Sequence, residues 1–308
     1  GEAFDIVASV TDVSQLDGET RGRVRGIAVA IGKGSGVTPD FIDAFPNLEI
    51  LSSFGVGYDH VDASYAGSRG VMVTNTPDVL TEEVADTAIG LLLNTVRELP
   101  KAEAWLRDGK WTGKGPYPLS KGSLRGRSVG IFGMGRIGLA IARRVEAFGL
   151  PVSYHNRSRV DGVDYAYYPT LIDLARNVDT LISIAPGGDS TLKAVNADVL
   201  KALGPDGVFV NIGRGSTVDD EALAAALADG TIMAAGLDVF ANEPHVPEAL
   251  LKAENASLLP HVGSASVYTR RAMADLVVDN LLSWFEHGKA LTPVAETRSV
   301  HQPGSGTS

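Results

Sequence analysis

The stretch that decides the fold is residues 128–148, SVGIFGMGRIGLAIARRVEAF, where a short apolar run leads into a glycine-rich turn and then a helical pattern. The turn carries Gly133, Gly135 and Gly138 in the spacing GxGxxG. The first glycine allows a tight turn, the second lets the backbone approach a pyrophosphate, and the third lets helix and strand pack closely. In a chain with 35 glycines this spacing alone would be weak. The predicted strand before it and the predicted helix after it make it specific for a dinucleotide.

Two further residues of this turn are expected to line the dinucleotide site. Arg136 and Ile137 lie where the helix begins, so the first free N–H groups of the helix face the phosphates. Arg136 is expected to contact the pyrophosphate, although a solvated side chain is an equal alternative.

The residues after the next predicted strand indicate which dinucleotide is bound. The strand 152–155 is followed by Asn156, Arg157 and Ser158, and no carboxylate occurs before Asp161. In an NAD site an acid at this place accepts a hydrogen bond from the ribose 2′-OH, and the same acid would repel a 2′-phosphate. An arginine fork beside two small polar side chains would hold that phosphate. The sequence therefore predicts NADPH in preference to NADH, with these three residues as selectors. The alternative is a basic surface turn.

The rest of the chain alternates short apolar runs with longer helical patterns, which predicts βαβ units, a mostly parallel sheet and the α/β class. The predicted strands are 26–31, 48–52, 71–74, 128–132, 152–155, 180–184 and 208–212. The clearest predicted helices are 81–99, 139–148, 219–229 and 266–285. Because the glycine motif begins only after residue 132, a complete α/β module is expected to precede the dinucleotide-binding module.

Two segments lack this alternation. Residues 101–126 are repeatedly interrupted by glycine and proline, so we expect an extended arm with little regular structure. Its aromatic residues, among them Trp105, Trp111 and Tyr117, would pack either on another subunit or on their own chain. The tail after Val294 has no periodicity and is expected to be disordered.

The composition of the chain limits its size class and the kinds of partner that it can bind. A chain of 308 residues with 44% hydrophobic residues can form two cores of ordinary size. The net charge of −10, with scattered acids, disfavours nucleic acid as a partner. No cysteine is present, which excludes disulfides, thiolate nucleophiles and cysteine-ligated zinc, and we expect no metal site. Without a long apolar run or a basic leader, the protein is expected to be cytoplasmic and not to bind membranes.

Polar segments follow three later predicted strand ends. They are NIGRG at 211–215, GLDVFANEP at 236–244 and LPHVGS at 259–264. Because the carboxyl ends of parallel strands meet at one crevice, we expect Arg214, Glu243 and His261 to converge there. Taken singly, each of these residues is more often structural or solvated.

The three side chains suit the reduction of a 2-keto acid. This reaction needs an anchor for the carboxylate, polarisation of the carbonyl and a proton for the new alkoxide. Arg214 can serve the first two needs with its fork of donors. His261 can supply the proton, because the ordinary pKa of a histidine, about 6.5, is close to neutral pH. Glu243 would fix the imidazole tautomer and favour its protonated form.

The glycine turn at 133–138, NIGRG at 211–215, GLDVFANEP at 236–244 and LPHVGSAS at 259–266 resemble motifs of the D-isomer-specific 2-hydroxyacid dehydrogenase family. The resemblance is strongest to the glyoxylate/hydroxypyruvate reductase branch and covers about residues 50–294. The resemblance implies that Arg214, Glu243 and His261 form the catalytic triad, with Arg214 and His261 also contacting the substrate. It implies that Asp238 contacts the nicotinamide carboxamide. The residues that it places along the cofactor cleft are Ala185, Pro186, Ile212 and Gly263.

The resemblance also assigns a role to the segment SFGVGYD at 53–59. In the family this loop grips the substrate carboxylate through backbone N–H groups. Here the matching substrate-binding residues are Ser53, Val56 and Gly57, with the N–H groups of Val56 and Gly57 as donors.

The implied architecture is a Rossmann-type doubly wound parallel sheet inserted into a smaller flavodoxin-like α/β substrate domain. Its expected bounds are 1–97 for the first part of the substrate domain and 98–285 for the dinucleotide-binding domain, with 286–308 returning to the substrate domain and ending as a disordered tail. The arm around Trp111 implies a homodimer, in which an aromatic side chain reaches the neighbouring active site. Compared with the family, a strand and a helix ahead of residues 4–10 are expected to be missing.

The expected function is thus the NADPH-dependent reduction of a small 2-keto acid, glyoxylate or hydroxypyruvate, to the D-2-hydroxy acid, with His261 as proton donor. Two alternatives stay open. One is a related dehydrogenase acting on a larger 2-keto acid, such as a phenylpyruvate or 2-ketogluconate. The other is a non-enzymatic dinucleotide-sensing protein on the same fold, similar to the corepressors related to these dehydrogenases.

Overall fold

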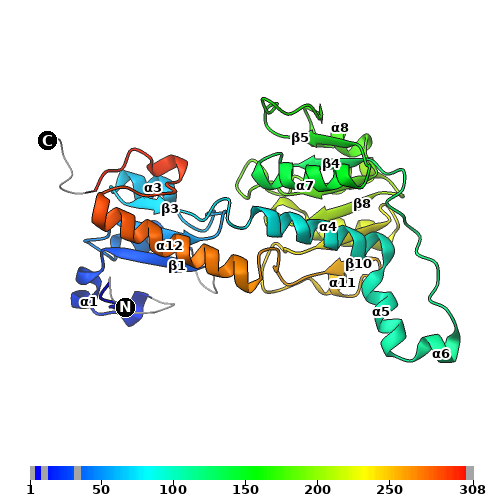
Figure 1. Ribbon diagram of the computed structural model, residues 1–308, viewed down its shortest axis with the longest axis horizontal. Coiled ribbons are helices and arrows are strands. Elements are labelled where there is room, and N and C mark those ends of the chain that lie inside the picture. Colours follow the sequence, from blue (N-terminus) through cyan, green and yellow to red (C-terminus); the bar gives the residue numbers. More distant parts are fainter. Residues whose placement is uncertain (1–3, 8–12, 31–35, 303–308) are drawn as a thin grey trace. The chain divides into compact units, whose positions relative to one another are not determined.

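The computed structural model of the protein describes residues 4–7, 13–30 and 36–302. The chain forms two compact units. The first unit combines both ends of the chain, residues 1–80 and 266–308, and the second unit is the middle, residues 81–265 (Figure 1).

The first unit is built on a three-stranded parallel sheet. Its strands are β1 (Gly26–Ala30), β2 (Ile50–Phe54) and β3 (Met72–Thr74), paired in the order β1-β2-β3. Its helices are α1 (Gly18–Arg23), α2 (Pro39–Asp43), α3 (Ala63–Ser68) and α12 (Val267–His287). The long helix α12 packs on β1 and β2 (Figure 1). The central strand of this sheet, β2, is buried almost throughout.

The second unit is a doubly wound parallel sheet of seven strands. They are β4 (Val129–Phe132), β5 (Val152–His155), β6 (Ala166–Tyr167), β7 (Thr180–Ser183), β8 (Val208–Asn211), β9 (Ala234–Leu237) and β10 (Ala256–Leu258). Their order is β10-β9-β8-β7-β4-β5-β6, so the strand order reverses between β4 and β7. Ligands of open α/β sheets bind at the carboxyl ends of the strands beside such a reversal. The predicted α/β class with a Rossmann-type sheet is confirmed.

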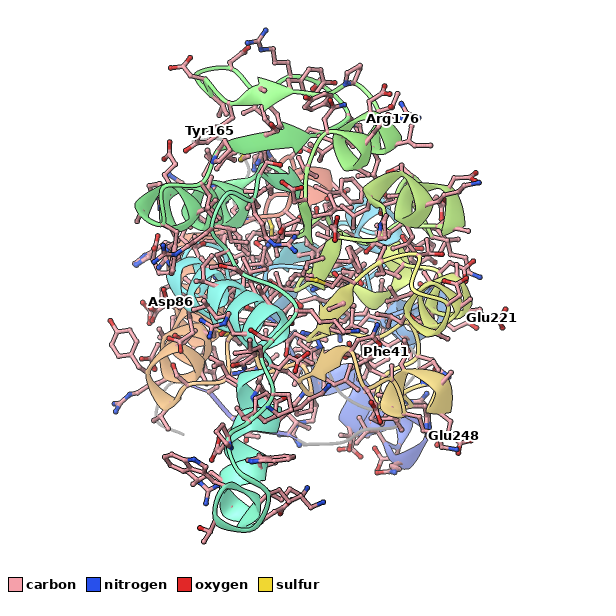
Figure 2. All side chains as sticks on the ribbon, turned by 90° about the vertical axis from the view of Figure 1, so that its right-hand side faces the viewer. Phe41, Asp86, Tyr165, Arg176, Glu221 and Glu248 are labelled. Atoms are coloured by element: carbon pink, nitrogen blue, oxygen red, sulfur yellow. The ribbon has the colours of Figure 1, made fainter. Side chains whose placement is uncertain are left out.

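Helices cover both faces of this sheet. They are α4 (Thr81–Arg97), α7 (Arg136–Ala147), α8 (Leu171–Arg176), α9 (Ala197–Leu203), α10 (Asp220–Ala228) and α11 (Glu248–Leu251). Two further helices, α5 (Leu99–Arg107) and α6 (Lys110–Lys114), follow α4 and extend away from the strands (Figure 1). Helices α4 and α7 pack on each other, as do α8, α9 and α10 in sequence. Figure 2 shows Asp86 of α4 and Glu221 of α10 on opposite sides of the strands. Both acids point away from the sheet, so the apolar faces of the helices are left for the core.

The boundaries of the compact units differ from the predicted ones at 97/98 and 285/286. Helix α4 belongs to the second unit because it packs on β8, β9, β10 and α7, and α12 belongs to the first because it packs on β1 and β2. Periodicity shows that a helix has an apolar face, but it does not show which sheet that face will cover.

The prediction for residues 101–126 was wrong in its first half. Helices α5 and α6 occupy 99–107 and 110–114, and only the part after Gly115 is mostly irregular. Good helix formers lie between the glycines, and Gly109, with φ of 69°, ends one helix and starts the next. Here glycine separates two helices and does not prevent them.

The tail was also predicted wrongly as far as residue 302. After the bridge between Thr74 and Pro293, a 3₁₀ turn forms over Ala295–Thr297. The fully buried Thr297 accepts a hydrogen bond from the N–H of Val73 and donates one to its carbonyl. Long-range hydrogen bonds therefore order a segment that has no periodicity of its own.

Most predicted elements agree with the structure to within two residues at each end. Strands β6, β9 and β10 lay outside the predicted set. Some residues discussed from the sequence lie outside the described part of the chain, namely Ile31 of the first predicted strand, residues 8–10 near the start and residues 303–308 of the tail. Within the described residues, no helix has both the length and the apolar character needed to span a membrane.

Candidate active site

The glycine turn after β4 has the geometry that a pyrophosphate site needs. Gly133 has φ of 107°, and a Cβ there would lie 2.7 Å from the backbone nitrogen of Ala185. A Cβ on Gly138 would overlap the carbonyl oxygen of Gly133, so α7 can approach β4 closely only with glycine. An added Cβ at Gly135 would meet no atom within 4 Å, and no side chain caps the start of α7. The open backbone before this helix therefore fits an anionic group.

The selector turn after β5 is joined to the glycine turn. The side-chain oxygen of Asn156 accepts a 2.6 Å hydrogen bond from the N–H of Met134, and the backbone carbonyl of Asn156 accepts one from the Tyr167 hydroxyl. Arg157 and Ser158 are exposed at the same turn. The structure thus gives Asn156 a positioning role that the sequence had not indicated, and it leaves the other two side chains accessible to a ligand.

Arg214 follows β8 in a turn whose backbone is closely held. The side chain of Asn211 accepts from the N–H of Gly213 and donates to the carbonyl of Arg214, which also accepts from the Thr217 hydroxyl at 2.7 Å. A Cβ at Gly215 would overlap the backbone of Phe240. Only glycine therefore permits the Arg214 turn to lie against the segment that leads to Glu243.

Glu243 and His261 form a direct pair. His261 Nδ1 lies 2.7 Å from one carboxylate oxygen of Glu243, and the other oxygen accepts a 3.0 Å hydrogen bond from the N–H of Phe240. About a third of each side chain is exposed, 36% for His261 and 33% for Glu243, so solvent or substrate can reach the pair.

The pKa of Glu243 reflects this setting. Burial by itself would raise the pKa, but the hydrogen bonds from His261 and Phe240 and the charges of His261 and Arg214 bring it below its ordinary value. The structure therefore pairs Glu243 with His261, and it packs the turn that carries Arg214 against Phe240, whose N–H group bonds to Glu243.

Asp238, at the end of β9, holds the loop that carries His261. Its carboxylate is 1% exposed and accepts hydrogen bonds from the N–H groups of Val262 at 2.7 Å and Gly263 at 2.8 Å. Its backbone carbonyl accepts from the N–H of His261, which has φ of 54° in the left-handed region. Such a conformation costs about 1–3 kcal/mol outside glycine and persists only where neighbours enforce it. Burial raises the pKa of Asp238.

The other predicted cofactor residues lie at the same edge of the sheet. Ala185 contacts the glycine turn and is 2% exposed, whereas the neighbouring Pro186 is exposed. Ile212 is 5% exposed, and a Cβ on Gly263 would lie 3.6 Å from it and 3.0 Å from Asp238. These residues follow β7, β8 and β10, at the carboxyl ends of the strands.

The predicted substrate residues Ser53, Val56 and Gly57 belong to the first unit. Ser53 is buried at the end of β2, with its hydroxyl 3.3 Å from Nε2 of His60. Val56 and Gly57 are half-buried in the loop that follows. No described group of three or more His, Cys, Asp or Glu side chains is arranged to hold a metal ion.

Residues 89–263 match the family model described as the NAD-binding domain of D-isomer specific 2-hydroxyacid dehydrogenases. The chain belongs to this family. The match spans the glycine turn and all three members of the triad, and the family predicted from the motifs is confirmed.

Similar members of the 2-hydroxyacid dehydrogenase family include characterised reductases. A crystal structure of an NADPH-dependent glyoxylate/hydroxypyruvate reductase from Sinorhizobium meliloti, in complex with NADP and malonate, is 64% identical with a TM-score of 0.90, covering 93% of this chain and 88% of that one. Glyoxylate/hydroxypyruvate reductase A from Arabidopsis thaliana is 50% identical over 87% of this chain and 85% of its own. A hydroxyphenylpyruvate reductase from Plectranthus scutellarioides is 49% identical, with the same coverage of both chains.

Sequence reasoning named Asp238 only as a cofactor residue, and it predicted no positioning role for Asp238, Asn211 or Thr217. Asn211 and Thr217 hold the Arg214 turn, and the Asp238 carboxylate holds the His261 loop. A buried polar side chain directly at a strand end is a usable signal for such a role, because it must find hydrogen-bond partners in the adjoining turn.

Proposed function

We propose that this protein reduces small 2-keto acids, glyoxylate or hydroxypyruvate, to D-2-hydroxy acids with NADPH. The observation that carries the proposal is the hydrogen-bonded pair of His261 and Glu243, with the Arg214 turn packed against Phe240 next to Glu243, at the edge of the sheet that carries the glycine turn. The similar proteins named glyoxylate/hydroxypyruvate reductases support this substrate class.

NADPH, when bound, supplies the hydride. The cofactor would be held by Gly133, Gly135, Arg136, Ile137, Gly138, Asn156, Arg157, Ser158, Ala185, Pro186, Ile212, Asp238 and Gly263. Arg214 binds the substrate carboxylate and polarises the keto oxygen with its planar fork of donors. Because Glu243 occupies Nδ1 of His261, the proton for the new alkoxide comes from Nε2. The lowered pKa keeps Glu243 charged, and the charged carboxylate holds Nδ1 of the His261 imidazole.

The two units carry different parts of the proposed binding and catalytic machinery. The second unit carries the proposed dinucleotide site with Arg214, Glu243 and His261, and the first unit carries the loop whose Val56 and Gly57 N–H groups are proposed to bind a carboxylate. The direct test mixes the protein with NADPH and glyoxylate and follows the nicotinamide absorbance. Consumption of NADPH is expected. A dinucleotide sensor would consume none, and a panel with a phenylpyruvate and 2-ketogluconate tests the alternative of a larger substrate.

The cofactor preference gives a prediction at Arg157. We expect kcat/KM to be higher with NADPH than with NADH, and Arg157→Ala to lower the NADPH value about 10-fold because a charge-assisted contact to phosphate is lost. The NADH value should stay nearly unchanged. Arg176→Ala, which removes an exposed arginine of α8, is the matched control. Equal or better use of NADH by the wild type would contradict the predicted preference.

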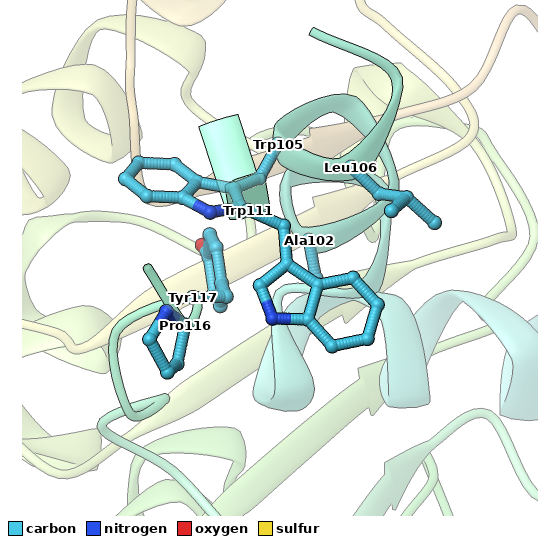
Figure 3. Close-up of a pocket in the computed structure, with 6 residues that line it drawn as sticks. All are labelled: Ala102, Trp105, Leu106, Trp111, Pro116 and Tyr117. Carbon is cyan, nitrogen blue, oxygen red and sulfur yellow. The ribbon is translucent and has the colours of Figure 1, made fainter. Parts of the chain in front are cut away.

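The homodimer expected from the sequence is proposed to form through the arm. A pocket of about 310 Å³ lies on the arm. Figure 3 shows the residues that line it: Ala102, Trp105, Leu106, Trp111, Pro116 and Tyr117. Trp105 packs edge-on against Tyr117, with the ring centroids 5.8 Å apart, and its indole N–H donates a hydrogen bond to the carbonyl of Gly115. The arm is therefore held within its own chain. Trp111 and Leu106 nevertheless remain 61% and 55% exposed. Large exposed apolar side chains around a pocket are typical of an interaction site.

This proposal predicts the mass in solution. Light scattering should give twice the mass of one chain, and Trp111→Asp should shift it toward a single chain because a charge enters the apolar contact. Leu251→Asp, at a 60% exposed leucine of α11, should leave the mass unchanged. A single-chain mass for the wild type would refute the dimer. The cytoplasmic location stays a prediction from the sequence.

A further inference from the structure

The loop Gly55–Gly57 is held from behind by two neighbouring residues. The N–H of Gly55 donates to the Thr76 hydroxyl at 3.0 Å, and the N–H of Thr76 donates to the carbonyl of Gly55 at 2.8 Å. The side-chain amide of Asn75 donates to the carbonyl of Val56 at 2.8 Å.

These contacts set the directions of two N–H groups. A peptide unit is planar and trans, so its N–H points opposite to its carbonyl. The carbonyl of Gly55 shares a peptide with the N–H of Val56, and the carbonyl of Val56 shares one with the N–H of Gly57. Thr76 therefore orients the first N–H group and Asn75 orients the second.

Asn75 is itself fixed by the returning end of the chain. The Thr292 hydroxyl donates to the carbonyl of Asn75 at 2.6 Å, and the N–H of Asn75 donates to the carbonyl of Thr292 at 3.3 Å. This joins residues that are 217 positions apart in sequence.

Thr292 is in turn held by Asn280 of α12, which is fully buried. The side-chain oxygen of Asn280 accepts from the N–H groups of Leu291 and Thr292, both at 3.0 Å. Its amide donates to the Thr292 hydroxyl and to the carbonyl of Leu276, both at 2.9 Å. All four hydrogen-bonding positions of this side chain are thus used.

We propose that Asn280, Thr292 and Asn75 form a positioning relay that aims the N–H group of Gly57 at the carboxylate of the substrate. The inference rests on the proposed function, in which the loop binds that carboxylate. None of the three residues is assigned a contact with the substrate. A fully satisfied buried polar network is rigid, and a preorganised donor binds an anion without a cost for reorientation.

The test compares near-isosteric variants. Asn75→Asp keeps the shape but replaces the donor with a carboxylate oxygen facing the Val56 carbonyl, so the peptide should turn. We expect KM for glyoxylate and the competitive inhibition constant of malonate to rise about 10-fold each, as for the loss of one well-placed hydrogen bond. KM for NADPH should stay within about twofold, because that cofactor is proposed to bind the other unit.

Thr292 supplies a matched pair. Thr292→Val removes the hydroxyl and should raise both constants in the same direction, whereas Thr292→Ser keeps it and should restore them. Asn47→Asp is the control, since it removes a side-chain donor to the carbonyl of Gly22, also in the first unit but away from the loop. If Asn75→Asp fails to fold, the Thr292 pair carries the test.

The relay is refuted if the constants for glyoxylate and malonate do not change, or if Asn47→Asp and Thr292→Ser change them equally. Calorimetric measurement of malonate binding to the wild type distinguishes a refuted relay from a refuted keto-acid reductase activity. A wild type that binds malonate but reduces no keto acid refutes the activity and still tests the relay. A wild type that binds no malonate refutes the carboxylate loop and the relay together.

Discussion

Replacement of His261 by asparagine is expected to lower kcat for keto-acid reduction by about 10²–10⁴-fold, the range for loss of a general acid. Asparagine is the appropriate substitute because His261 has φ of 54°, and asparagine tolerates this left-handed conformation better than other non-glycine residues. The loss should fall mainly on kcat, since the proton is delivered only as the alkoxide forms.

Two control measurements show whether the loss in His261→Asn is specific to the proton transfer. NADPH binding, followed by fluorescence, should be unchanged, because the proposed phosphate-binding turns lie at β4 and β5. His287→Asn removes an exposed histidine at the end of α12 and should leave turnover unchanged. Near-normal kcat in His261→Asn would remove this residue from the mechanism.

Replacement of Arg214 by lysine is expected to lower kcat/KM by about 10³-fold, although the charge is retained. Lysine offers a point charge and cannot hold a carboxylate and a keto oxygen with one planar fork. Since the Arg214 backbone is fixed by Asn211 and Thr217, the shorter reach of lysine cannot be recovered by a shift of the turn. Both KM and kcat should therefore worsen.

The matched control for Arg214 is Arg143→Lys. Arg143 is an exposed arginine of α7 paired with Glu82, and its exchange should change kcat/KM by less than about twofold. A loss of less than about 10-fold in Arg214→Lys would show that charge alone is enough, and it would contradict the bidentate role given to Arg214.

The glycine turn shows what could be predicted from residue spacing. Gly133 and Gly138 are required by a positive φ and by close contact between backbones, and both requirements concern atoms within a few residues. Such local demands are visible as a motif. The pairing of Glu243 with His261 also followed from the rule that parallel strands end at one edge of a sheet.

The arm and the tail show where spacing was insufficient. Glycines in residues 101–126 were taken to prevent helices, but Gly109 and Gly115 only flank them. The tail has no periodicity, yet Thr297 is buried because Val73 supplies its partners from more than 200 positions away. In the tail, tertiary contacts outweigh local preference, whereas in the arm the residues between the glycines themselves favour helices.

By itself, the sequence determined the α/β class, the glycine turn, the family and the strand ends that Arg214, Glu243 and His261 follow, because each of these depends on short-range spacing or on a general rule of sheet geometry. Only the tertiary structure decided which sheet α4 and α12 cover, how Asp238 holds the His261 loop, and how Asn280 and Thr292 reach the loop at Val56. These are pairings between distant parts of the chain, and a hydrogen bond depends on distances and angles that residue order does not contain.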